Sequence, residues 1–284
     1  MIEVVAPGPL CTVQDLGRPG LAYLGVGRSG AADRPALRLA NRLVGNAEDA
    51  AGLEATLGSL TLRFDAAGLI AVAGAPTEVS VGGRAGGMNA PLSVPAGGTV
   101  ELAAPAAGVR CYLAVRGGIA VEPVLGSRST DLLAGLGPPR LAAGMRLPVG
   151  AEVLGFPAVD LAPVSPLPDV VVLRALLGPR DDWFTPQARD DLGRHTYEVS
   201  PASDRVGLRL HGPALERGRS DELPSEGMVE GALQVTPDGM PVLLLADHPV
   251  TGGYPVIAVV DTDDVHLAAQ ARPGQQVRFR LAPR

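Results

Sequence analysis

Short apolar segments recur along the chain at close intervals, and glycine and proline separate them. Runs rich in Val, Leu, Ile and Thr between such turn residues are typical of strands in an antiparallel β protein. The 37 glycines and 27 prolines fit a chain with this many turns. The predicted strands span residues 2–6, 60–64, 68–74, 77–81, 99–103, 109–116, 169–177, 195–199, 207–211, 232–236, 241–246, 256–261 and 275–281. The pattern therefore predicts a mainly β fold.

Helix signals are few. Asp33 is a suitable N-cap for a helix that has Pro35 in its first turn. We predict a second helix over 47–57, a third that begins at Thr185 before a proline, and a short fourth over 263–270. These elements add little helical content to the predicted β fold.

A proline-rich stretch divides the chain. The sequence "FPAVDLAPVSPLP" at 156–168 holds four prolines in thirteen residues and lacks a strand pattern. Such composition is typical of a linker between domains. We therefore predict one domain over 1–160, a second over 168–284, and a linker at 161–167.

Composition excludes several function classes. The net charge of −6 without a basic cluster argues against binding of nucleic acid or anionic lipid. The apolar runs are much shorter than the roughly 20 residues of a membrane-spanning helix. The first residues, "MIEVVAPGPL", lack the features of a signal peptide, so we expect a cytoplasmic protein. Cys11 and Cys111 have no C-x-x-C spacing, and we expect two buried thiols rather than a disulfide or zinc site.

All 24 basic residues are arginine, and the sequence contains no lysine. A composition bias that replaces Lys by Arg is the simplest cause. The chemical consequence holds whatever the cause. This chain lacks the amine needed for a Schiff base, a Walker A site, covalent attachment of biotin or pyridoxal phosphate, and a Ser-Lys amidase mechanism.

The spacing G-x-G-x-x-G occurs at Gly25, Gly27 and Gly30, which raises the question of a dinucleotide site. Such a site needs a preceding parallel strand and a helix whose free N-terminus meets the pyrophosphate. Here a Pro-Gly turn precedes the glycines, and Asp33 would place its own carboxylate at the helix N-terminus. We therefore interpret the glycines as a polar loop instead of a nucleotide fingerprint.

Seven motifs, in order along the chain, resemble the allophanate hydrolase subunit 2 (KipA) family, and the match extends over 1–282. This family includes one of the subunits of bacterial 5-oxoprolinase and is related to the carboxyltransferase region of urea carboxylase. The motifs are "TVQDLGRPG" (12–20), "LGVGRSGAAD" (24–33), "LANRLVGN" (39–46), "LAVRGGI" (113–119), "LGSRST" (125–130), "SDRVGLRL" (203–210) and "TGGYP" (251–255).

The resemblance implies two cyclophilin-like β-barrel domains and a homologous KipI-like partner. It implies a subunit of an ATP-dependent amide or lactam hydrolase, most simply 5-oxoprolinase, with a separate lactam-utilisation subunit. ATP would then be shared with partner subunits, and the chain would carry no covalently bound cofactor. Two alternatives are a carboxyltransferase that uses biotin carried on another chain, and a regulatory module that antagonises a KipI-like kinase inhibitor.

Three side chains are candidate catalytic groups. Asp33 lies in a motif of the family, and a purely structural N-cap worth ~1 kcal/mol explains it equally well. Asp247 and His248 end the predicted strand 241–246, where an acid–base group could act on an amide or lactam. A surface position is the alternative for His248.

The candidate binding residues lie in polar, glycine-rich motifs. Arg128 has a hydroxyl residue on each side and could bind an anion through its five N–H donors, although a satisfied turn is the alternative. An exposed pair of Asp204 and Arg205 would contribute only about 0–1 kcal/mol. The candidates are Arg28, Ser29, Gly30, Arg128, Ser129, Asp204, Arg205, Thr251, Gly252, Gly253 and Tyr254, and no residues show metal-ligand spacing.

Other matching positions have simpler explanations. Glu54 matches a family position, but in the predicted helix 47–57 it would hold local structure. After "TGGYP" the family usually has a basic residue, and here the residue is Val256. If that base contacts substrate or carboxybiotin in the family, this chain has lost the contact.

Overall fold

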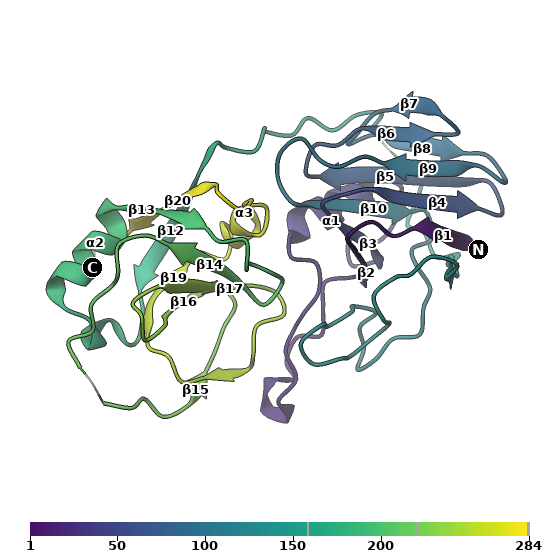
Figure 1. Cartoon of the computed structure of the whole chain (residues 1–284). Coiled ribbons are helices and arrows are strands. Elements are labelled where there is room, and N and C mark those ends of the chain that lie inside the picture. Colours follow the sequence, from purple (N-terminus) through teal and green to yellow (C-terminus); the bar gives the residue numbers. More distant parts are fainter. Residues whose placement is uncertain (158, 220, 283–284) are drawn as a thin grey trace. The chain divides into compact units, whose positions relative to one another are not determined.

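The computed structural model describes residues 1–157, 159–219 and 221–282. They form two compact units, drawn in Figure 1. Unit 1 comprises Met1–Arg18 and Ser29–Leu167, and unit 2 comprises Pro19–Arg28 and Pro168–Arg284. The proposal that 1–160 and 168–284 are cyclophilin-like domains joined by 161–167 stays a prediction.

Unit 1 contains two antiparallel sheets. One has the strand order β11-β1-β4-β9-β6-β7 and the other β2-β3-β10-β5-β8. The strands are β1 (Ile2–Ala6), β2 (Leu10–Gln14), β3 (Gly52–Thr56), β4 (Leu60–Phe64), β5 (Gly68–Gly74), β6 (Val79–Val81), β7 (Arg84–Gly86), β8 (Pro91–Val94), β9 (Thr99–Leu102), β10 (Arg110–Val115) and β11 (Arg146–Leu147). One apolar cluster holds side chains of both sheets, including Val4, Leu62, Leu53 and Leu113. The two sheets therefore share a core.

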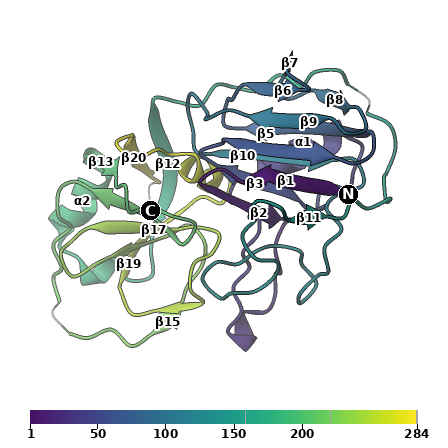
Figure 2. The same ribbon diagram turned by 45° about the vertical axis from the view of Figure 1, so that its right-hand side comes forward.

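Helix α1 (Arg34–Leu43) packs against β5 and β10 of the second sheet (Figure 2). Its Leu37 and Leu43 form a cluster with Tyr112 and Ala114 of β10. The alternate β10 residues, such as Leu113, belong to the core that the sheets share. Because successive side chains of a strand point to opposite faces, β10 is buried along its whole length.

Unit 2 contains a closed barrel with the strand order β12-β19-β16-β17-β14-β13-β20. Strands β12 and β20 run parallel and close the ring, while the other neighbours are antiparallel. The barrel strands are β12 (Val170–Leu177), β13 (Thr196–Val199), β14 (Gly207–His211), β16 (Ala232–Val235), β17 (Pro241–Leu244), β19 (Val256–Val260) and β20 (Gln276–Leu281). Along β12 the side chains alternate, with Val171 and Leu173 buried in the barrel and Val170 and Val172 exposed.

The remaining elements of unit 2 are short. A two-stranded sheet pairs β15 (Glu226–Gly227) with β18 (Thr251–Gly252). The helices are α2 (Pro186–Arg194), α3 (Val265–Ala269) and the 3-10 helices η1 (Ala22–Leu24) and η2 (Asp181–Trp183). Helix α2 begins as predicted, because the Thr185 hydroxyl accepts a hydrogen bond from Ala188 N at 3.1 Å. None of the helices among the described residues is long and apolar enough to cross a membrane.

The mainly β prediction is confirmed, and every predicted strand overlaps an observed one. The predicted helix over 47–57 is wrong. Its second half is β3, which pairs with β2 on one side and β10 on the other. The Ala- and Glu-rich sequence favours a helix locally, but hydrogen bonding to two neighbouring strands overrides that preference. Both cysteines are buried and free, as expected.

Candidate functional site

The carboxylate of Asp15 joins two of the motifs in unit 1. Asp15 follows β2 and is only 8% exposed. Its Oδ1 accepts hydrogen bonds from Gly17 N at 2.8 Å, from the Ser127 hydroxyl at 2.6 Å and from the Ser129 hydroxyl. Its Oδ2 accepts from Arg128 N at 2.6 Å. One buried carboxylate therefore fixes the whole "GSRS" turn.

Arg128 is held at two points and keeps the end of its side chain available. Besides its backbone N–H, its Nε donates to the carbonyl of Val121 at 2.7 Å. Among the described residues, nothing accepts a hydrogen bond from its two terminal amino groups. The side chain is half-buried. This arrangement orients a guanidinium group without neutralising it.

The Arg128 side chain lines a pocket of about 590 Å³ in unit 1. Three loops form the rest of the wall, at 47–51, 117–120 and 150–154. Gly117 has a φ of +93°, and a Cβ there would lie 2.0 Å from the carbonyl oxygen of Gly150. Only glycine permits this approach of two loops. The exposed carboxylates of Asp49 and Glu152 also line the pocket.

The predicted loop residues Ser29, Gly30 and Asp33 hold a second turn of unit 1. The Ser29 hydroxyl donates to the carbonyl of Thr130 at 3.2 Å, so this turn is tied to the residue that follows Ser129. Gly30 has a φ of +91°, and a Cβ there would lie 2.7 Å from Gly17 N. The structure thus gathers parts of three motifs, at 12–20, 24–33 and 125–130.

Asp33 is the N-cap of α1. Its Oδ1 accepts a hydrogen bond from Ala36 N at 3.0 Å, and it is 5% exposed. The helix N-terminus is therefore occupied by a carboxylate of the chain itself. A 3-10 helix, η1, precedes the glycines instead of a parallel strand. Both observations agree with the rejection of a dinucleotide fingerprint.

Beneath this turn lies a buried polar cluster that the sequence pattern did not indicate. Glu54 Oε2 accepts from the Tyr112 hydroxyl at 2.7 Å and from Ala32 N at 3.0 Å, and the Tyr112 oxygen accepts from Asp33 N at 2.7 Å. Arg110 Nε lies 3.5 Å from Glu54 Oε1. Burial and the nearby Glu54 carboxylate raise the pKa of Tyr112 well above its ordinary value. Glu54 holds long-range structure, and its place between the apolar Leu53 and Ala55 is compatible with a strand.

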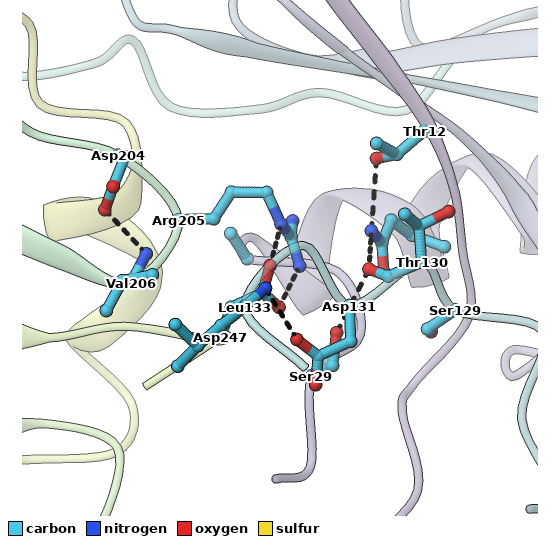
Figure 3. Close-up of polar contacts among 12 residues, drawn as sticks. Thr12, Ser29, Ser129, Thr130, Asp131, Leu133, Asp204, Arg205, Val206 and Asp247 are labelled. Carbon is cyan, nitrogen blue, oxygen red and sulfur yellow. Dashed lines mark hydrogen bonds and ion pairs between the residues drawn. The ribbon is translucent and has the colours of Figure 1, made fainter. Parts of the chain in front are cut away.

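Unit 2 contains a buried ion pair between two predicted site residues. Arg205 Nε and Nη2 each lie 2.8 Å from an oxygen of Asp247 (Figure 3). Arg205 is 2% exposed and Asp247 is 1% exposed. The neighbouring Asp204 carboxylate accepts from Val206 N at 2.8 Å and Gly207 N at 3.1 Å. This geometry differs from the exposed Asp204–Arg205 pair considered as an alternative, because Arg205 pairs with Asp247.

The other predicted residues of unit 2 lie in loops that follow Asp247. His248 Nδ1 is 2.8 Å from the carbonyl oxygen of Pro249. Gln234 Nε2 donates to the carbonyl of Tyr254 at 3.2 Å, which holds the "TGGYP" loop against the barrel. Val256 is buried in a small apolar cluster with Met228, Ala232 and Leu244. A charged side chain at Val256 would have to leave this cluster.

The predicted site residues thus belong to two groups. Unit 1 holds Ser29, Gly30, Asp33, Arg128 and Ser129, and Asp15 and Glu54 add to this group. Unit 2 holds Arg28, Asp204, Arg205, Asp247, His248 and the loop 251–254. Their roles in catalysis and binding stay predictions.

Comparisons with known proteins agree with this architecture. The chain is 40% identical to the third, or C, component of 5-oxoprolinase from Escherichia coli (strain K12) over 282 residues, which cover 98% of this chain and 90% of the relative. The solved structure of TTHA0988 superposes with a TM-score of 0.90 at 38% identity, covering 98% of this chain and 55% of that one. The K. lactis urea amidolyase gives a TM-score of 0.92 at 30% identity, covering 99% of this chain and 19% of that one.

The family model that matches is described as "Carboxyltransferase domain, subdomain A and B", and it matches residues 24–281. That span includes the Arg128 turn of unit 1 and the Arg205–Asp247 pair of unit 2. The chain therefore belongs to the carboxyltransferase domain family, which confirms the resemblance that its ordered motifs indicated.

Proposed function

We propose that this protein is a subunit of a 5-oxoprolinase, which opens the lactam ring of 5-oxoproline to glutamate with ATP. The proposal further places the active site between this chain and a KipI-like partner, with a lactam-utilisation protein completing a cytoplasmic assembly. The observation that carries it is the half-buried Arg128, whose terminal amino groups line a pocket. An arginine fork binds carboxylate through two parallel hydrogen bonds.

Sequence similarity supports this choice among the members of the family. Identity is 40% to the 5-oxoprolinase component of Escherichia coli and 30% to the urea amidolyase structure. The absence of lysine removes an amidase mechanism of the Ser-Lys type from this chain, and with it one interpretation of the family name.

ATP would supply the phosphoryl group that activates the lactam carbonyl. The pocket of unit 1 does not fit a triphosphate well, because it offers one guanidinium beside the carboxylates of Asp49 and Glu152. The N-terminus of α1, another common phosphate site, is taken by the Asp33 side chain. We therefore assign most of the nucleotide contacts to partner subunits, with this chain contributing to the carboxylate end of the substrate.

Reconstitution tests the proposal. The purified chain is mixed with a KipI-like protein and a lactam-utilisation protein, and glutamate formation from 5-oxoproline and ATP is measured. We expect no glutamate from this chain alone and glutamate from the full mixture. Turnover by the isolated chain would contradict a shared site, and an inactive full mixture of folded proteins would contradict the 5-oxoprolinase assignment.

The family description favours a second candidate, a carboxyltransferase. Because the chain has no lysine, biotin would have to be carried by another polypeptide. Titration with a biotinylated carrier protein and with free biotin separates the two functions. Saturable binding that requires biotin would support the carboxyltransferase, and its absence together with glutamate formation would support 5-oxoprolinase.

A further inference from the structure

The pocket beside Arg128 is built around a guanidinium whose direction is set by two other parts of unit 1. Asp15 holds the backbone of Arg128, and the Val121 carbonyl holds its Nε. Asp15 itself is buried and accepts three further hydrogen bonds, from Gly17, Ser127 and Ser129. Few side-chain torsions remain free, so a ligand that meets this fork loses little affinity to ordering of the arginine.

The remaining lining indicates which anion the fork would bind. Asp49 and Glu152 place two carboxylates on the wall of the same pocket. These carboxylates repel a phosphate or polyphosphate, which carries about two or more negative charges at neutral pH. They attract a ligand that has N–H donors beside a single carboxylate, because carboxylate oxygens accept such bonds.

The loops leave space for such a ligand. Gly117, Gly118 and Gly150 form part of the wall and have no side chains to fill the pocket. The volume of about 590 Å³ lies in the range of small-molecule sites, about 300–1,000 Å³. A compact molecule of amino-acid size fits this volume with room for water.

We propose that the pocket lined by Arg128, Asp49 and Glu152 binds a small carboxylate that also carries N–H groups, the chemistry of an amino acid or its lactam. Arg128 binds the carboxylate, and the two acidic side chains accept from the nitrogen. Asp15 is a positioning residue that keeps the Arg128 turn in place. The inference rests on the proposed function only for the choice of 5-oxoproline and glutamate as probes.

The test is direct binding to the full purified chain, without turnover. Calorimetric titration with 5-oxoproline, glutamate, inorganic phosphate and ATP distinguishes the sources of the anion. We expect 5-oxoproline or glutamate to bind, with phosphate and ATP at least about tenfold weaker. The variant Arg128→Ala should lower the affinity about tenfold to 100-fold, since a hydrogen bond to a charged group contributes about 1.5–3 kcal/mol.

Two further variants make the test specific. Arg84→Ala removes an exposed guanidinium from the same unit and should leave binding unchanged. Asp15→Asn keeps the size of the side chain but replaces one acceptor oxygen by an amide. We expect it to weaken binding less than Arg128→Ala does and to reduce the discrimination against phosphate, as a loosened fork accepts more geometries. Thermal melting checks that each variant is folded.

The outcomes separate this inference from the proposed function. Unchanged binding in folded Arg128→Ala, or tighter binding of phosphate than of the carboxylates, would overturn the inference even if the reconstituted assembly makes glutamate. Binding that depends on Arg128 would support the inference even if the assembly makes none. Full activity of an assembly that contains Arg128→Ala, without measurable binding of either carboxylate, would also overturn it.

Discussion

Arg128 of unit 1 and Arg205 of unit 2 look alike in the sequence and differ in the structure. Each lies in a polar motif beside hydroxyl or carboxylate residues. Arg205 is 2% exposed and directs its fork at the buried carboxylate of Asp247. Arg128 uses its backbone and Nε for attachment and keeps its terminal amino groups in a pocket.

The difference shows how one residue type can serve two purposes. A buried charge needs a partner, because removal from water is expensive, and Asp247 satisfies Arg205. A half-buried guanidinium keeps part of its hydration and can exchange it for a ligand. We therefore expect substitution of Arg205 to change stability, and substitution of Arg128 to change binding.

The largest expected effect tests this contrast directly. Arg205→Ala should lower the free energy of unfolding of unit 2 by about 3–5 kcal/mol, because Asp247 would remain buried without its partner. Arg128→Ala should cost about 1 kcal/mol, from the lost bond to Val121. Urea unfolding followed by Trp183 fluorescence reports on unit 2, since Trp183 is the single tryptophan and is buried there. Circular dichroism follows the unfolding of Arg128→Ala.

Two controls sharpen this result. Arg209→Ala removes an exposed guanidinium from β14 and should change stability by less than about 0.5 kcal/mol. The double variant Arg205→Met with Asp247→Leu should be more stable than Arg205→Ala, since no charge is left unpaired. An unchanged unfolding midpoint in Arg205→Ala would mean that the pair contributes nothing.

The next effect compares one buried tyrosine from each unit. The Tyr112 hydroxyl donates to Glu54 and accepts from Asp33 N, whereas the buried Tyr197 hydroxyl has no hydrogen-bond partner among the described residues. Tyr112→Phe should cost about 1–3 kcal/mol, because it leaves those buried groups unsatisfied. Tyr197→Phe should be close to neutral near pH 7. Equal losses in the two variants would contradict this contrast.

Alkaline pH gives the Tyr112 prediction a second readout. Burial and the Glu54 carboxylate raise the pKa of Tyr112 above its ordinary value of 10.0. Above about pH 10 the unfolded chain releases this proton while the native protein keeps it, so stability that is fully present below that pH declines as pH rises. Because phenylalanine has no such proton, the cost of Tyr112→Phe should shrink between about pH 9 and about pH 11. A constant cost would indicate that the tyrosine does not remain protonated in the folded state.

The smallest effect compares two helix caps. Asp33 caps α1 in unit 1 and Thr185 caps α2 in unit 2, each through a side-chain oxygen. Substitution of either by alanine should cost about 0.5–2 kcal/mol. Asp33→Asn should keep the stability, because asparagine is an equally good cap.

The same Asp33→Asn variant examines the catalytic role of the carboxylate. We expect it to lower turnover of a reconstituted assembly about 100-fold or more, which is the range of a general acid or base. Thr185→Ala should lose stability without that loss of turnover. If Asp33→Asn retains full activity, Asp33 acts as a cap alone.

Local sequence was sufficient for most of the fold. The β12 segment alternates buried and exposed positions, and α1 and α2 begin at residues whose side chains suit a cap. Residues 52–56 were predicted as helix because Ala, Glu and Asp dominate that region. Strand β3 forms there because β2 and β10 supply hydrogen bonds on both sides, and those partners are distant in the sequence.

The sequence by itself determined the family, the mainly β composition and the exclusion of lysine chemistry, since each depends on residue identity and local pattern. Only the tertiary structure decided which arginine presents its fork and which is neutralised. Asp15 lies 113 residues from Arg128, and Asp247 lies 42 residues from Arg205. Burial of a charge depends on groups brought together across such separations, and motif spacing carries no record of them.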